Sequence, residues 1–194
     1  MDRVVASVGP IAITQRDVEG EYHFEQFLQG RSPTGSPDST ARRAVLNRLI
    51  SQKLLTGQMS DTAGESANGQ KAAEKTLNQV RKEFPSDAAY RSALEAIGMT
   101  EPQVLKRLAI YQGTLRMIDD RLRSSAWPAP DEVETYYRET FVPEYAKTHS
   151  TPPPPLAEVQ GQVQEVLVQK KMNQLLEKWL ERLKSTNRVV IHSN

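Results

Sequence analysis

Apolar residues recur at three- and four-residue steps along most of the chain, which is the spacing of helices that bury one side. One such helix is predicted from residue 42 to about residue 58, and a longer one from 156 to 184. Shorter helices are predicted over the apolar sets at 18–28, 73–84, 90–97, 108–122 and 133–141. The pattern indicates a mainly α-helical protein.

Runs of β-branched residues lie near both ends of the chain. Residues 4–8 (VVASV) stop at Gly9-Pro10, and Ile11 and Ile13 continue the extended pattern, so we expect a short hairpin. Residues 189–191 (VVI) form a second isolated run. Two strands alone are marginally stable, so we expect the N-terminal and C-terminal strands to pair and to rest on the helices.

Two helix faces are defined closely enough to predict their neighbours. The residues Leu108, Tyr111, Leu115, Ile118 and Leu122 step by 3, 4, 3 and 4, as a seam against another helix would. In the long C-terminal helix the apolar stripe changes face midway. One stripe comprises Leu156, Val159, Val163 and Val166, and the other comprises Met172, Leu175, Leu176, Trp179 and Leu183.

Local signals predict where helices begin, where they end and where the chain is irregular. Thr14 and Asp17 form a capping sequence, and Gly98 suits a left-handed helix end. Residues 60–70 lack large apolar side chains and are expected to form a mobile loop. Proline-rich stretches break the chain near Trp127 and again over residues 148–155, where an extended connector is expected.

These breaks suggest three parts. Residues 1–128 form a helical core with the N-terminal strand, residues 129–155 form a short helix and a proline-rich connector, and residues 156–194 form a long helix and a strand that pack back on the core. The expected fold is therefore helical with one small β element.

Composition narrows the possible functions. The 194 residues contain 25 Lys and Arg against 24 Asp and Glu, so the positive field of a nucleic-acid-binding protein is missing. With no cysteine there is no disulfide, thiol nucleophile or thiolate metal site. No apolar run approaches the ~18–20 residues of a membrane span, and we expect none. The chain starts without the apolar core of a signal peptide, although a removed export signal is compatible with this start.

Candidate catalytic groups are scattered. His23, His149 and His192 lie on three different predicted elements and lack metal-ligand spacing, so we expect no metal site and no Ser-His-Asp relay. Acidic pairs such as Asp119-Asp120 fit solvated helix surfaces better than acid–base catalysis. No glycine-rich phosphate loop is present, and no cofactor is expected.

Short motifs follow one another in a definite order along nearly the whole chain. The first is an Ile-Thr-x-x-Asp-Val helix start after a strand and a glycine turn (Ile13, Thr14, Asp17, Val18), and the second is a Val-Leu-x-x-Leu-Ile-x-x-x-Leu-Leu helix (Val45, Leu46, Leu49, Ile50, Leu54, Leu55). The third is a Gly-Met-Thr turn (Gly98, Met99, Thr100). The last is a closing helix and strand (Leu156, Val159, Trp179, Leu180, Leu183, Val189, Ile191). This order resembles the N-terminal chaperone module of the SurA and PrsA family of extracytoplasmic foldases.

The resemblance implies a SurA N-terminal-like helical chaperone domain that works in the periplasm or elsewhere outside the cytoplasm. Family members often carry a parvulin-type prolyl isomerase domain of about ninety residues. Here only residues 145–155 stand in its place, and the parvulin motifs (a His-Ile start, Gly-Gly-Asp-Leu-Gly and Phe-Gly-x-His) do not occur. We therefore expect a chaperone core without isomerase activity.

Aromatic and methionine side chains are the candidate binding residues, because they are large, adaptable and suited to promiscuous apolar contacts. The candidates for contacting a polypeptide client are Tyr22, Phe27, Met99, Tyr111, Trp127, Tyr136, Tyr137 and Phe141. We expect most of them to be part of the core, and Tyr136, Tyr137 and Phe141 are the stronger candidates for client contact because they share a short helix beside proline-rich breaks.

The leading hypothesis is an ATP-independent holdase that shields apolar segments of unfolded polypeptides in a groove between the core helices and the helix near 131–145. A second hypothesis is a dimerisation module that exchanges its C-terminal helix and strand with another copy. A third is a member of a peptidyl-prolyl isomerase family with an unrecognised site.

Overall fold

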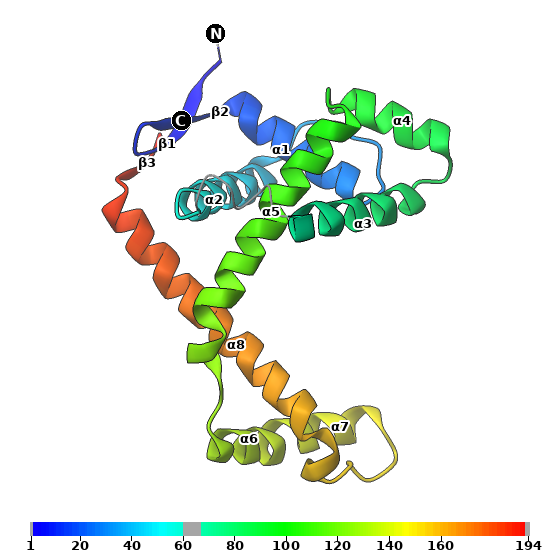
Figure 1. The fold of residues 1–194 in the computed structure, drawn as a ribbon, viewed down its shortest axis with the longest axis vertical. Helices are drawn as coiled ribbons and strands as arrows, with labels where there is room; N and C mark the ends of the chain where they lie inside the picture. The colour runs from blue at the N-terminus through cyan, green and yellow to red at the C-terminus, as the bar shows by residue number, and fades with distance from the viewer. Residues whose placement is uncertain (1, 60–66, 193–194) are drawn as a thin grey trace. The chain divides into compact units, whose positions relative to one another are not determined.

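Strands from both ends of the chain meet in one antiparallel sheet in the computed structural model, which describes residues 2–59 and 67–192 (Figure 1). The strands are β1 (Val4–Val8), β2 (Ile11–Thr14) and β3 (Val189–Ile191), in the order β2-β1-β3. The expected pairing of the N-terminal and C-terminal strands is therefore present.

The register of the sheet places its small and branched side chains over the helices. Ala6 pairs with both Ile13 and Ile191, and Val8 pairs with Ile11 and Val189. Ala6 and Ile13 are at most 1% exposed, so this face of the sheet belongs to the core.

Most of the remaining described chain is helical, and the chain divides into two compact units. One unit is Met1–Met117 together with Leu180–Asn194, and the other is Ile118–Trp179. The boundaries fall inside two helices, α5 (Glu101–Leu122) and α8 (Leu156–Thr186).

The first unit contains four further helices, α1 (Gln15–Leu28), α2 (Ser39–Thr56), α3 (Ala67–Glu83) and α4 (Asp87–Ala96). Their core is a cluster of buried side chains from α1, α3, α4, α5 and the loop after α3. It comprises Phe24, Phe27, Ala73, Leu77, Val80, Phe84, Tyr90, Ala93, Val104, Leu108 and Ala109.

Side chains at the helix ends confirm the predicted caps. The Thr14 amide donates to Asp17 Oδ2 at 2.8 Å, and the Asp17 amide donates back to Thr14 Oγ1 at 3.2 Å. Ser86 caps α4 by accepting from the Ala89 amide at 3.1 Å. Gly98 follows α4 with φ +63°, the left-handed conformation that glycine tolerates best.

The predicted loop over residues 60–70 is wrong at its C-terminal end, because α3 already begins at Ala67. A glycine at position 69 costs a helix only about 1 kcal/mol relative to alanine, and Ala73 and Leu77 are buried just beyond it. The remaining part of that prediction, residues 60–66, lies outside the described residues.

The predicted seam on α5 is wrong at its centre. Leu108, Ile118 and Leu122 are buried as expected, but Tyr111 is 49% exposed and Leu115 is 43% exposed. The side of α5 that packs in the first unit instead carries Val104, Leu108 and Ala109. A regular three-four spacing predicts one face of a helix, but it does not predict that a neighbour covers the whole face.

The second unit contains a helical stretch with three segments, α6 (Pro130–Tyr136), a π-helical turn (Tyr137–Phe141) and α7 (Val142–Thr148). An irregular segment then leads to α8, as the connector prediction requires. The buried centre of this unit consists of Val133, Val159 and Val163.

The first predicted stripe of α8 is wrong at its last position. Val166 is 42% exposed, whereas Val168, which is not in either predicted stripe, is completely buried. Val168 lies one helical turn before Met172, the first residue of the second predicted stripe, and both are buried. The second stripe therefore begins at Val168, earlier than the sequence suggested.

Candidate functional site

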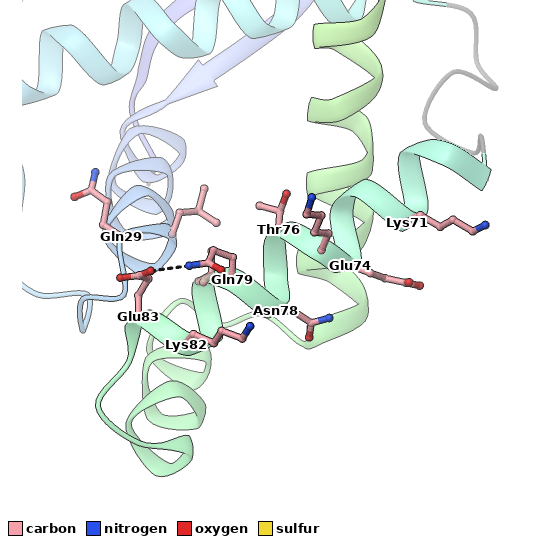
Figure 2. Close-up of a pocket in the computed structure, with 11 residues that line it drawn as sticks. Gln29, Lys71, Glu74, Thr76, Asn78, Gln79, Lys82 and Glu83 are labelled. Atoms are coloured by element: carbon pink, nitrogen blue, oxygen red, sulfur yellow. Dashed lines mark hydrogen bonds between the residues drawn. The ribbon is translucent and has the colours of Figure 1, made fainter.

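One hollow on the first unit, with a volume of about 1000 Å³, lies along α3 (Figure 2). Apart from Gln29, which follows α1, its labelled side chains come from successive turns of α3 and fan out in different directions. They mix lysines such as Lys71 and Lys82 with glutamates such as Glu83. Gln79 donates to Glu83 Oε1 at 3.0 Å. These features describe a solvated helix face, so we place no site there.

A smaller pocket of about 450 Å³ lies among β2, α1, α2, α5 and the turn after α4. Its apolar lining consists of Ile13, Leu49, Ile97, Met99 and Ile110. Its polar side chains are Arg16, Asp17, Glu21, Gln52, Lys53, Thr56 and Arg107. We call it the Met99 pocket.

The turn after α4 brings two of the apolar side chains to the Met99 pocket. Gly98 reverses the chain with its positive φ, and its neighbours Ile97 and Met99 both line the pocket. Ile13 and Leu49 are almost fully buried in the walls, whereas Ile97, Met99 and Ile110 are only partly buried. These last three side chains provide the accessible apolar surface.

An ion pair with a buried carboxylate lies in the polar part of the Met99 pocket. Glu21 on α1 is 5% exposed and pairs with the Arg107 guanidinium from α5. The same guanidinium lies 4.0 Å from the centroid of the Phe24 ring, and Gln52 Nε2 contacts Glu21 Oε1 at 3.5 Å. Burial lowers the pKa of Arg107 below its ordinary value. An arginine nevertheless stays protonated in proteins, so the pair remains ionic.

The Met99 pocket can bind apolar groups, and two of its carboxylates already have partners. Asp17 serves the cap of α1, and Glu21 pairs with Arg107. Across the described parts of the chain, no group of three or more His, Asp or Glu side chains could hold a metal ion. The arrangement therefore suits binding, and it offers no nucleophile next to a base.

The predicted binding residues separate into several environments. In the first unit Met99 lines the pocket. Phe27 is 0% exposed and stacks among Phe24, Phe84 and Tyr90, so its side chain is part of the core. Tyr22 is partly buried with its ring 5.9 Å from that of His23.

Tyr111 and Trp127 are the most exposed of the predicted binding residues. Tyr111 on α5 is 49% exposed and Trp127 is 58% exposed. Leu115, one helical turn after Tyr111, is 43% exposed, so the two side chains form an apolar strip on α5.

The remaining predicted residues, Tyr136, Tyr137 and Phe141, pack partly buried against the valine centre of the second unit. Tyr137 and Phe141 also begin a ladder of rings that continues through Tyr145 to His149, with centroid separations of 5.6, 5.9 and 4.0 Å. The Tyr137 hydroxyl donates to the Pro154 carbonyl at 2.8 Å, which holds the proline-rich connector on this ladder.

Sequence reasoning missed most of the Met99 pocket. Ile13, Leu49 and Ile110 looked like ordinary core positions, and nothing in the spacing of Glu21 and Arg107, 86 residues apart, indicated that they pair. The available signal for Met99 was its place in the Gly-Met-Thr turn.

No protein-family model matches the chain, and no curated protein matches it. No helix in the described ranges is both long and apolar enough to cross a membrane.

Proposed function

We propose that the protein is an ATP-independent chaperone that binds apolar segments of unfolded polypeptides and holds them without isomerising their proline bonds. The observation that carries the proposal is the Met99 pocket, in which partly exposed apolar side chains surround an ion pair that is satisfied internally. Such a pocket can take an apolar side chain without leaving a buried polar group unpaired.

Exposed apolar side chains beyond the pocket support the proposal. Tyr111 and Leu115 lie on α5, the helix that also contributes Ile110 to the pocket. Single exposed apolar residues are common on protein surfaces, but a pair one turn apart on the same helix gives an extended client further apolar area to bury.

The proposed location, the periplasm or another extracytoplasmic compartment, rests on the resemblance to the SurA and PrsA family. The same resemblance suggests that the clients are proteins that have yet to fold. Binding would be weak and driven by burial of apolar surface, so that clients are released without nucleotide hydrolysis.

The test is suppression of the aggregation of a chemically denatured protein on dilution. Wild-type protein in several-fold excess is expected to slow the aggregation. Met99→Gln is expected to weaken this protection by about fivefold, since it forfeits roughly 1 kcal/mol of apolar burial. Met117→Gln is the matched control, because Met117 is a partly buried methionine on α5 outside the pocket.

Two outcomes would contradict the proposal. One is wild-type protein that leaves aggregation unchanged at every ratio. The other is a protein that light scattering shows to be a dimer and that ignores unfolded clients, which would favour the dimerisation module with an exchanged C-terminal helix and strand.

A further inference from the structure

A separate pocket of about 390 Å³ lies where the sheet meets the first turns of α2. Three arginines line it, Arg3 before β1 and Arg42 and Arg43 on α2. No carboxylate is among the described residues that line it. In a chain whose charges nearly balance, this concentration of one sign in a small concave site creates a local positive potential. We call it the arginine pocket.

Arg42 has unused hydrogen-bonding capacity. Its Nη2 donates to the Pro37 carbonyl at 3.4 Å, but its Nε is buried and has no hydrogen-bond partner in the described protein. Buried donors are nearly always paired in folded proteins. A small shift of this side chain toward an acceptor in the pocket would satisfy the donor.

The charged donors of this pocket are its arginine side chains, because the start of α2 is already capped. The carboxylate of Asp38 already caps the helix by accepting from the Ala41 amide at 2.8 Å. Guanidinium groups donate in a planar fork that matches the two oxygens of a carboxylate, so the side chains alone can hold such a ligand.

The rest of the lining is mixed, because it combines the polar Gln15, Ser39, Asn47 and His192 with an apolar part formed by Val5, Val18, Leu46 and Ile191. Ile191 is 54% exposed and lies on β3, an edge strand of the sheet. A bare inorganic anion would leave this surface in water, whereas an anion that ends an apolar chain would cover it. The volume is at the lower end of the range for small-molecule sites and fits the last few groups of such a chain.

We propose that the arginine pocket binds a carboxylate that ends an apolar chain, as the C-terminus of a polypeptide or a fatty acid does. Arg42 and Arg43 hold the carboxylate, and the chain lies against Leu46 and Ile191. This site is distinct from the Met99 pocket, with which it shares no lining residue, and it does not depend on chaperone activity.

The test measures fluorescence anisotropy of a labelled peptide that ends in Val-Leu, in its free-acid and C-terminal amide forms. The acid is expected to bind about tenfold more tightly than the amide, the size of effect that a charge-assisted hydrogen bond supplies. Equal affinities would overturn the proposal. Unlabelled decanoate then distinguishes the sources, since displacement shows that a fatty acid also binds and no displacement shows that the site is specific for the polypeptide end.

Variants place the ligand in the arginine pocket. Arg43→Gln, at an exposed position, is expected to abolish the preference for the acid, whereas Arg116→Gln, an exposed arginine on α5 outside the pocket, is expected to keep it. Ile191→Ser is expected to weaken both peptide forms. An acid preference that survives Arg43→Gln, or displacement of the peptide by inorganic phosphate, would contradict the assignment.

Discussion

At the scale of single residues, the buried carboxylate of Glu21 matters most for the Met99 pocket. It is 5% exposed, and its negative charge is balanced by Arg107 on α5. Glu21→Ala removes this buried carboxylate and leaves Arg107, whose side chain is 35% exposed, without its partner, so the variant is expected to lower the free energy of unfolding by about 2 kcal/mol. Urea unfolding followed by circular dichroism measures this.

Glu25 provides the control for Glu21, since it lies one turn later on α1 and also pairs with an arginine, Arg48. That pair is solvent-accessible, and Glu25→Ala is expected to cost less than about 1 kcal/mol. An equal loss of unfolding free energy in the two variants would show that the Glu21 carboxylate is not buried.

Tyr90 gives the fold a defined response to alkaline pH. The side chain is 1% exposed and donates to Glu101 Oε1 at 2.8 Å, and burial followed by the nearby carboxylate raises the pKa of Tyr90 from 10.0 to about 12. Since the folded pKa exceeds the unfolded one, the stabilisation is complete below pH 10 and is lost as the pH rises through 12.

The expected loss is at most about 2 kcal/mol, because each pKa unit corresponds to about 1.4 kcal/mol and the exposed Glu101 moderates the effect. Thermal unfolding of the wild type and of Tyr90→Phe, measured from about pH 9 to about pH 12, tests this loss of stability. The phenylalanine variant should decline less steeply. Parallel curves would mean that the buried phenol does not contribute.

At the scale of elements, the two faces of α8 are expected to differ in energy. Val163 is 1% exposed in the core of the second unit, and Val163→Ala is expected to cost about 2 kcal/mol of unfolding free energy through lost burial and a cavity. Val166 on the same helix is 42% exposed, and Val166→Ala is expected to change stability by less than about 0.5 kcal/mol. Denaturant titrations measure both costs. A larger loss of unfolding free energy for Val166→Ala than for Val163→Ala would show that the buried face of α8 is wrongly assigned.

Element types were predictable from sequence because helix periodicity, β-branched runs and caps are local. The hairpin, the capping box at Thr14 and the long helix from Leu156 are all present where these signals placed them. The exposure of Leu115 and Val166 was not predictable, since it depends on where the packing against neighbouring elements stops.

The candidate sites were less predictable than the fold. Met99 could be selected from its turn, but the pocket around it brings together residues from β2, α1, α2 and α5 that are distant in sequence. The arginine pocket had no sequence signal, because Arg3 becomes a neighbour of Arg42 only through tertiary packing of the sheet against α2.

At the scale of the whole molecule, the near balance of charge predicts how client binding responds to salt. A net charge of +1 gives little long-range attraction, and apolar burial is not screened by ions. The protection of an unfolded client should therefore change by less than about twofold between low and high salt. Aggregation assays in both conditions would contradict apolar binding if high salt abolished protection.

The central claim is that unfolded clients contact the Met99 pocket, and site-directed photo-crosslinking tests it most directly. A photoreactive amino acid is placed at position 99, or at position 117 as the matched control, and the protein is illuminated with a labelled unfolded client. Strong crosslinking from position 99 and little from position 117 is the predicted result. Equal crosslinking from both positions, or none from position 99 in a protein that still suppresses aggregation, would contradict the claim.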